Sequence, residues 1–324
     1  ELDLWADSGA ALSDVGGDRR RGRSSDKAAG MKPVPFDYVR PQSIEEACAA
    51  LARDDSVIIA GGQTLIPMLA MRLARPASIV DIARIPGLAG IREEEGVVVI
   101  GATTRQAEAE RSALVVRRVP LLAKALPLVG HAPTRNRGTV GGSVANADPA
   151  AEIPLVLVTL AGTVVVRDVT RTRAIPAHDF FLGPMMTAAP TGAIVTELRF
   201  PVWTGERLGV AFHEISTRQS DFALAAAAAQ VSLDAGGRCL VCAVGIGAAT
   251  PVPARLDAAA GKLIGSKLAD GDIRDALADA IDAVDIMIDT HASPDYRRRA
   301  AKALALRAIA QARDAALASE RSRA

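Results

Sequence analysis

Two glycine pairs constrain this chain more than any other feature of its sequence. Gly61-Gly62 lies in "AGGQT" and Gly141-Gly142 in "TVGGS", and each is expected as a turn after an apolar strand and before a helix. Without Cβ atoms, such a turn lets backbone N–H groups approach a ligand closely. A helix N-terminus adds unpaired N–H groups and a positive dipole end, which favour an anion. One pair alone is more simply interpreted as a tight turn, whereas two pairs predict a site that binds the two phosphates of a dinucleotide. Thr64, Thr139 and Ser143 would add hydroxyl donors.

Strand and helix patterns alternate irregularly along the chain, without clear parallel crossovers, which predicts an α+β fold rather than a doubly wound sheet. Ser43, with Glu46 three residues later, is a capping-box signature for a helix start. The expected strands cover 56–62, 78–82, 96–104, 163–169 and 192–202. Expected helices cover 64–76, ended by Arg75-Pro76, then 114–129 and 148–162, the last capped by Asp148 with Pro149 at its first position.

A composition shift near residues 203–207 predicts a boundary between two domains, 31–205 and 206–324. Beyond it, the alanine run 225–229 is helical on propensity, but the turn at 235–237 favours a strand. A long helix is expected from Ser293-Pro294 onward. Residues 1–30 are poor in large apolar side chains, so we interpret them as a disordered or non-native extension before Met31.

Composition excludes several functional classes. The net charge is +1 and 3% of residues are aromatic, which argues against a nucleic-acid surface. No apolar run reaches the ~20 residues of a membrane span. Three cysteines in a chain of 324 residues are no disulfide framework and indicate a reducing, cytoplasmic compartment. Cys239 and Cys242 are expected on opposite faces of a strand, as core residues, and no set of residues has metal-ligand spacing.

The two glycine loops together resemble a known family. "AGGQTLIPMLAMRLARP" and "RNRGTVGGSVANADPAAEIP", in this order, are similar to the FAD-binding medium subunit of the molybdenum hydroxylases, such as the xanthine and carbon monoxide dehydrogenases. The resemblance covers the chain from about Lys32 to its end. It implies a two-subdomain, PCMH-type FAD-binding domain followed by a smaller α+β domain like the C-terminal domain of the carbon monoxide dehydrogenase flavoprotein.

The resemblance also implies which residues bind FAD. The first pyrophosphate loop corresponds to Ile59, Ala60, Gly61, Gly62, Gln63, Thr64 and Leu65, and the second to Gly138, Thr139, Gly141, Gly142 and Ser143, with Asn146 nearby. Glu152 stands where the family usually has an aspartate that meets the adenosine-side hydroxyls. Val129 and Gly130 fall near the isoalloxazine ring, and Ile194 matches an apolar position that flanks the flavin.

Glu214, in "FHEISTR", departs from the family, which often has a lysine at this position near the flavin. A carboxylate there would disfavour negative charge on the reduced flavin. The resemblance therefore leaves open whether Glu214 shifts the flavin potential or whether a neighbour such as His213 makes the contact.

The function implied is that of a FAD-dependent oxidoreductase subunit with no catalytic residue of its own for the organic substrate. It would pass electrons from the [2Fe–2S] clusters of a small subunit to an external acceptor. A large molybdopterin-binding subunit would hydroxylate the substrate, for which an aromatic N-heterocycle is our hypothesis, in a dimer of heterotrimers. Two alternatives stay open: a stand-alone FAD oxidase or reductase of the same fold, and a structural subunit with a degenerate flavin site.

Overall fold

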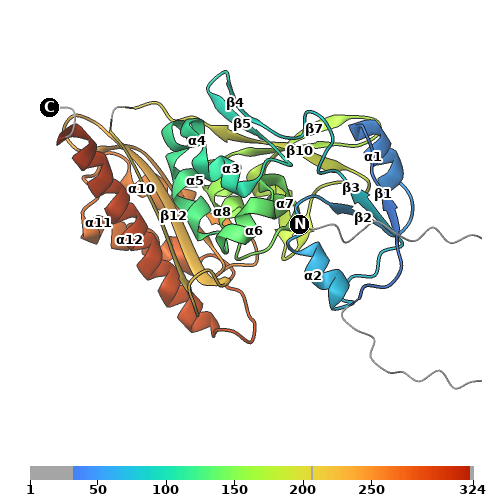
Figure 1. Cartoon of the computed structure of the whole chain (residues 1–324). Helices are drawn as coiled ribbons and strands as arrows, with labels where there is room; N and C mark the ends of the chain where they lie inside the picture. Colours follow the sequence, from blue (N-terminus) through green and yellow to red (C-terminus); the bar gives the residue numbers. More distant parts are fainter. Residues whose placement is uncertain (1–31, 206, 322–324) are drawn as a thin grey trace, which may run out of the picture.

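Four β-sheets and their covering helices make up the part of the chain that the structure describes, and the α+β prediction is confirmed (Figure 1). The structure is a computed structural model, and it describes residues 32–205 and 207–321. The extension predicted over residues 1–30 lies outside the described residues.

The N-terminal segment builds a three-stranded parallel sheet in the order β1-β3-β2. Its elements are β1 (Asp37–Val39), α1 (Ile44–Leu51), β2 (Ser56–Ile59), α2 (Leu65–Ala70) and β3 (Ser78–Asp81). The predicted cap of α1 is confirmed, because Ser43 Oγ accepts the amide of Glu46 at 3.1 Å. α2 ends before the expected stop at Arg75-Pro76, since Arg72 is left-handed, with φ of 59°. The parallel pairing was not evident from the sequence pattern.

The central sheet is antiparallel, in the order β4-β5-β10-β6-β7. Its strands are β4 (Ile91–Glu94), β5 (Val97–Gly101), β6 (Thr163–Arg167), β7 (Thr172–Pro176) and β10 (Ile194–Pro201), while β8 (Phe181–Gly183) and β9 (Met186–Thr187) form a separate hairpin. Between β5 and β6 lie α3 (Gln106–Arg111), α4 (Ala113–Arg118), α5 (Pro120–Ala125), the 3-10 turn η1 (Leu126–Leu128), α6 (Ala132–Arg137), α7 (Val140–Asn146) and α8 (Glu152–Thr159); α9 (Ala177–Phe180) follows β7. The helix expected over 114–129 is interrupted at Val119, because Pro120 has no amide hydrogen to continue α4.

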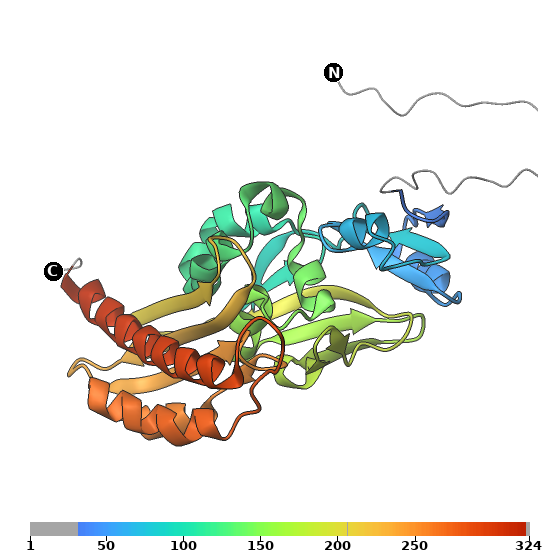
Figure 2. The ribbon, with the colours of Figure 1, turned by 90° about the horizontal axis from the view of Figure 1, so that it is seen from below.

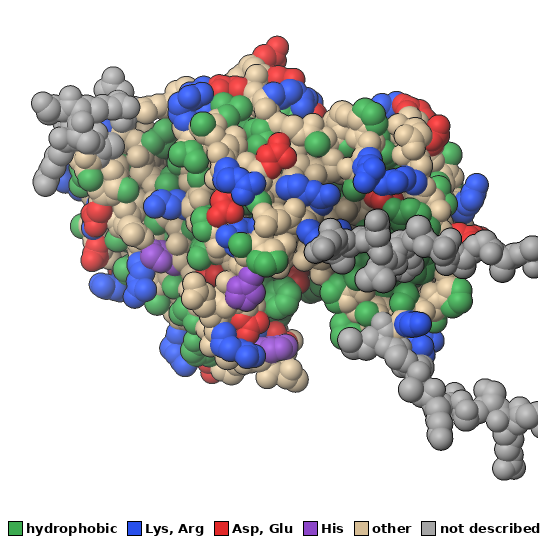
Figure 3. Space-filling view, in the orientation of Figure 1, with side chains coloured by type: hydrophobic (Ala, Val, Ile, Leu, Met, Phe, Trp, Pro, Cys, Tyr) green, Lys and Arg blue, Asp and Glu red, His purple; other side chains and the backbone are tan. Residues whose placement is uncertain are grey.

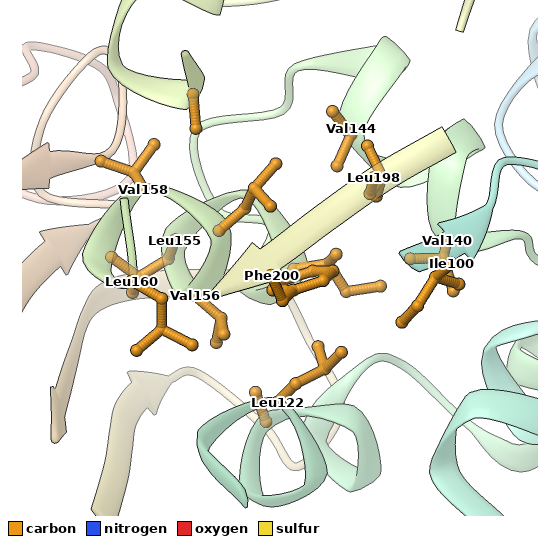
Figure 4. Close-up of a cluster of buried hydrophobic side chains, with 14 of the residues drawn as sticks. Ile100, Leu122, Val140, Val144, Leu155, Val156, Val158, Leu160, Leu198 and Phe200 are labelled. Atoms are coloured by element: carbon orange, nitrogen blue, oxygen red, sulfur yellow. The ribbon is translucent and has the colours of Figure 1, made fainter. Parts of the chain in front are cut away.

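A hydrophobic core joins the central sheet to the helices that follow β5 (Figure 4). Ile100 of β5 and Phe200 of β10 are fully buried there, together with Val140 and Val144 of α7. α8 is buried on all its sides, because α5 and α7 pack against it from the central part and β12 and β13 from the C-terminal part. Burial of side chains of this size contributes roughly 1.5–3 kcal/mol each. The core therefore fixes α7 and α8 relative to both large sheets.

The C-terminal segment forms a four-stranded antiparallel sheet covered by helices on both faces. Its strands are β11 (Leu208–Ser216), β12 (Ala223–Leu233), β13 (Cys239–Gly247) and β14 (Ala254–Arg255), followed by α10 (Asp257–Leu263), α11 (Asp270–Asp282) and α12 (Pro294–Arg321). The long α12 crosses one face of the sheet (Figure 2), while α5 and α8 contact the other. The alanine run 225–229 is a strand, as the turn after it predicted, and its small side chains let helices approach both faces.

Two local expectations from the sequence are wrong. α8 begins at Glu152 rather than just after Asp148, because Ala151 has an extended backbone, with ψ of 132°. Asp148 Oδ1 accepts the amide of Ala150 at 2.9 Å but closes only a turn. Cys239 and Cys242 do not face opposite sides of β13. Both are buried in the same hydrophobic cluster, because a β-bulge at Leu240 shifts the alternation of the strand.

The surface mixes charges of both signs, in line with the small net charge: on the face seen in Figure 3, Lys and Arg side chains are interspersed with Asp and Glu. Among the described residues, no helix is long and apolar enough to cross a membrane. Nor do residues 32–205 and 207–321 contain a group of three or more His, Cys, Asp or Glu side chains placed to hold a metal ion.

Candidate functional site

The first glycine loop, residues 60–64, joins β2 to α2 and presents backbone amides to solvent. Within the described part of the chain, the amides of residues 61–65 donate to no protein acceptor. Gln63 and Thr64 are exposed, and Gly62 is left-handed, with φ of 72°. A run of unpaired donors around a left-handed residue is a backbone concavity suited to an anion such as a phosphate.

The second glycine pair lies inside a helix, not in a turn after a strand. α6 ends just before Gly138, and Gly141 and Gly142 occupy the first turn of α7, which Thr139 caps. The amides of this turn are bonded within the protein: Val140 donates to Thr104 O at 2.9 Å, Gly141 to Ala102 O at 2.9 Å and Gly142 to Thr139 Oγ1 at 3.0 Å. The expectation that both glycine pairs offer free amides is therefore wrong for the second pair. Its half-buried Ser143 side chain stays available to a ligand.

Close backbone packing explains two of these glycines. A Cβ on Gly61 would overlap the carbonyl oxygen of Arg137 and lie 2.8 Å from Gly138 Cα. A Cβ on Gly141 would lie 2.6 Å from Ala102 Cα, where α7 meets the end of β5. The two glycine loops thus touch through bare backbone, although they are far apart in the sequence. The structure brings the two predicted loops into one site.

Arg135 of α6 connects this site to the predicted isoalloxazine residues. Its guanidinium donates to the carbonyl oxygens of Val129 at 3.2 Å and Gly130 at 3.0 Å, and forms an ion pair with Glu110 of α3 at 2.8 Å. Gly130 is left-handed, with φ of 49°. A bidentate, largely buried arginine of this kind fixes a turn in one orientation. Arg135 therefore ties the 129–130 turn to α6, the helix that leads into the second glycine loop at Gly138.

Glu152 and Glu214 form a carboxyl pair between α8 and β11. The pKa of Glu152 is raised to about 8: burial is the main cause, the nearby Glu214 and Asp148 also raise it, and a backbone hydrogen bond and Arg135 lower it. Burial also raises the pKa of Glu214 to about 7, and its Oε2 is buried without a hydrogen-bond partner in the described structure. At neutral pH the pair therefore retains protons, so Glu214 is not the full negative charge considered from the sequence.

The remaining predicted positions divide between the site and the core. Asn146 ends α7 and is half-buried. Ile194 is fully buried in the cluster on which Ala60 packs, so it supports the first loop from below and presents no surface to a ligand. His213 points to the opposite face of β11 from Glu214, toward Gln311 and Arg307 of α12, and burial lowers its pKa. The structure thus favours Glu214 over His213 as the group that faces the site.

Two positioning residues, Arg135 and Gln106, are not among those predicted from the sequence. The Gln106 amide donates to Gly138 O at 2.9 Å, and its side-chain Nε2 donates to Thr139 O at 3.4 Å. The tripeptide Arg-Asn-Arg before Gly138 was the sequence feature that could have indicated a role for Arg135. Its partners lie on α3, which only the tertiary structure places beside α6.

The N-cap of α7 gives a first testable expectation. Replacing Thr139→Val keeps the side-chain shape but removes the acceptor of the Gly142 amide, which costs about 1 kcal/mol of unfolding free energy. The matched control is Ser112→Ala, which removes the equivalent cap of α4 at Val115. Chemical denaturation should show similar losses for both variants. FAD affinity should fall only for Thr139→Val, and an equal fall for both would contradict a role for this cap in the site.

The assembled groups fit FAD. The unpaired amides of residues 61–65 suit a pyrophosphate, and the partly exposed Glu152 offers carboxyl oxygens to sugar hydroxyls. Arg135 fixes the orientation of the 129–130 turn, which the resemblance places near the ring.

Comparison with known proteins agrees with this fit. The FAD binding domain in molybdopterin dehydrogenase matches residues 34–203, and the CO dehydrogenase flavoprotein C-terminal domain matches residues 210–312. The 6-hydroxypseudooxynicotine dehydrogenase complex subunit alpha of Paenarthrobacter nicotinovorans is 37% identical over 284 residues, which are 87% of this chain and 96% of that protein.

Two solved structures have the same fold. A chain of carbon monoxide dehydrogenase from Hydrogenophaga pseudoflava matches with a TM-score of 0.83 and 33% identity, covering 87% of this chain and 99% of that one. A chain of quinoline 2-oxidoreductase from Pseudomonas putida 86 matches with a TM-score of 0.83 and 34% identity, covering 88% and 99%. The resemblance predicted from the two glycine loops is confirmed: the chain belongs to the family of FAD-binding medium subunits of molybdenum hydroxylases, and FAD is its cofactor.

Proposed function

We propose that this chain carries electrons through its FAD, from [2Fe–2S] clusters in a small partner subunit to an external acceptor. The observation that supports this most is the loop 60–64, which keeps its amides unpaired and packs at Gly61 against Gly138 of the second loop. Bound FAD supplies the redox chemistry. The chain's own residues bind, orient and set the electrostatics of the cofactor.

Each group in the site has a proposed part in this function. The amides of residues 61–65 and the hydroxyls of Thr64 and Ser143 bind the pyrophosphate. Glu152 binds adenosine-side hydroxyls, and Arg135 orients the 129–130 turn toward the ring. Glu214 holds a proton at its carboxyl below about pH 7, which keeps negative charge away from the site. Ile194 acts only through the packing of Ala60.

We propose the same partners as the sequence predicted: a large molybdopterin-binding subunit and a small [2Fe–2S] subunit, assembled as a dimer of heterotrimers in the cytoplasm. The substrate would bind the large subunit, and we propose an aromatic N-heterocycle. The similarity to the quinoline enzyme and to the 6-hydroxypseudooxynicotine enzyme supports this choice, although the carbon monoxide enzyme is about as similar. The domain boundary is proposed between β10 and β11, as the ranges 31–205 and 206–324.

The test uses the chain alone and the complex purified with its partner subunits. We expect a stoichiometric amount of FAD to be released from either on denaturation. The flavin absorbance of the complex should bleach on addition of an N-heterocycle such as quinoline, and carbon monoxide and an aldehyde are the matched alternative substrates. A folded chain without FAD would contradict the proposal and indicate a degenerate site. Turnover of an organic substrate by the isolated chain would instead indicate a stand-alone oxidase or reductase.

A further inference from the structure

The two cysteines of β13 are brought onto one face by a β-bulge. Cys242 pairs with Val231 of β12, and Cys239 pairs with Leu233, so that Leu240 is the extra residue between them. Val231 and Leu233 are two residues apart on a regular strand and share the face that packs against the C-terminal helices. Both cysteines therefore point into that same buried cluster, where they are 1% and 5% exposed.

The bulge also shortens the distance between the two cysteines. Residues paired opposite positions two apart on a strand have Cα atoms separated by about 6.6 Å, twice the rise per residue. A regular strand would separate positions three apart by about 10 Å. Disulfides require Cα atoms roughly 4.4–6.8 Å apart. The bulge thus brings Cys239 and Cys242 within disulfide range, which the C-x-x-C spacing in a regular strand would not.

The two thiols interact, and the interaction shifts their pKa values in opposite directions. They share a side-chain hydrogen bond, which lowers the pKa of Cys239 below its usual value, while the same bond and burial raise the pKa of Cys242. The thiolate is the nucleophile in sulfur chemistry. Cys239 is the first residue of β13, beside the short segment 265–266, whereas Cys242 lies within the strand, so Cys239 is the sulfur that reacts first and Cys242 the sulfur that resolves.

Access to this pair requires a local opening at the edge of β13. Leu240 and Val241, which lie between the cysteines, are 55% and 45% exposed. β14 pairs with β13 only at Gly245 and Ile246, and the backbone of residues 265–266 bonds to Cys239 on the same side. Short edge segments of this kind open locally at low cost in free energy.

We propose that Cys239 and Cys242 are a redox-active dithiol that closes reversibly to a disulfide when hydrogen peroxide is the oxidant. The Cys239 sulfur attacks a peroxide oxygen, the O–O bond breaks, and a sulfenic acid and one water form. The Cys242 sulfur then attacks the Cys239 sulfur, the S–O bond breaks, and the S–S bond forms with release of a second water. Two electrons pass from the dithiol to the peroxide, and both thiol protons leave in water.

The experiment is peroxide treatment of the full chain, followed by unfolding, alkylation and peptide mass spectrometry. Cys239 and Cys242 should lose alkylation together, and the peptide that contains both should lose the mass of two hydrogens. Dithiothreitol should restore alkylation of both. Cys48 is the internal control, because it is a single buried cysteine whose thiol contacts the carbonyl oxygen of Arg167, and its alkylation should not change.

A second arm keeps the test independent of disulfide stability. In Cys242→Ser, the resolving sulfur is absent, so peroxide should leave a sulfenic acid on Cys239 that dimedone traps. In Cys239→Ser, Cys242 should remain unmodified under the same treatment. Equal alkylation of both cysteines before and after peroxide, or dimedone labelling of Cys242 rather than Cys239, would overturn the proposal. The result does not depend on FAD, so its failure would leave the proposed electron-transfer function intact.

Discussion

A single methyl group at Gly61 is expected to weaken FAD binding on the order of tenfold to a hundredfold. In Gly61→Ala, the new Cβ would overlap the Arg137 carbonyl oxygen and lie 2.8 Å from Gly138 Cα. Both neighbours are backbone atoms, so no side-chain rotation relieves the overlap and the loops must separate. Overpacking of this kind costs about 1–3 kcal/mol, and each 1.4 kcal/mol is a factor of ten in affinity. The measurement is FAD affinity from flavin fluorescence with the purified chain.

The matched control for this prediction is Gly261→Ala in α10. A Cβ at Gly261 meets open space among the described residues, and alanine favours a helix over glycine by up to about 1 kcal/mol. This variant should keep wild-type FAD affinity and gain slightly in stability. Gly61→Ala should keep the overall circular-dichroism spectrum, because the central core does not include the loop. Wild-type FAD affinity in Gly61→Ala would show that the two loops do not have to touch for the cofactor to bind.

Much of the secondary structure could be predicted, because many helix starts and turns depend only on residues that are neighbours in the sequence. Ser43 and Glu46 predict the start of α1, and the turn at 235–237 predicts that the alanine run is a strand rather than a helix. The start of α8 could not be predicted in the same way. Asp148 has the right side chain for a helix cap and accepts the amide of Ala150, but the extended backbone of Ala151 delays the helix to Glu152. The carbonyl oxygen of Pro149 accepts the amide of Ala248, so a contact with a distant part of the chain, which the local sequence does not reveal, engages this segment.

The glycine pairs show the same limit within the site. Both were predicted from one physical reason, close approach of a ligand to bare backbone. In the structure Gly61 and Gly141 instead admit other parts of the protein, Gly138 and Ala102, and only the first loop keeps its amides free. Glycine without a Cβ serves either purpose, so the sequence identifies the loops but not what approaches them. Arg135 was not predicted for a related reason: its positioning role depends on an ion pair with Glu110, which lies in another helix.

The two carboxyls change how the glutamate at position 214, where the family often has a lysine, is interpreted. A glutamate at this position suggested a fixed negative charge that opposes negative charge on the flavin. Burial raises the pKa of Glu214 to about 7, and burial, helped by the nearby Glu214, raises the pKa of Glu152 to about 8. Below about pH 7 the pair is therefore largely neutral. The electrostatics of the site then depend on pH, with the Arg135 guanidinium as the nearby positive charge.

We expect the unfolding free energy of the chain to fall as pH rises from about 5 to about 8. Both glutamates have folded-state pKa values above the ordinary value near 4.3 of the unfolded chain. In this window the folded state binds more protons than the unfolded state, so their contribution is full below the unfolded pKa and is lost as pH rises through the folded pKa. The slope is at most about 1.4 kcal/mol per pH unit for each proton. Urea denaturation at several pH values measures it.

Substitution separates the two carboxyls. Glu152→Gln and Glu214→Gln should each flatten this slope, and the double variant should abolish the fall and leave the opposite contribution of His213, whose lowered pKa makes stability rise with pH. The exposed Glu108→Gln is the control that leaves the slope unchanged. The pair also predicts a coupling that burial alone does not give. Because Glu214 raises the pKa of Glu152, that pKa should fall in Glu214→Gln when followed by carbon-13 NMR of the side-chain carboxyls. An unchanged Glu152 titration in that variant would mean that the two carboxyls titrate independently, and the pH dependence of the site would then belong to burial of each residue by itself.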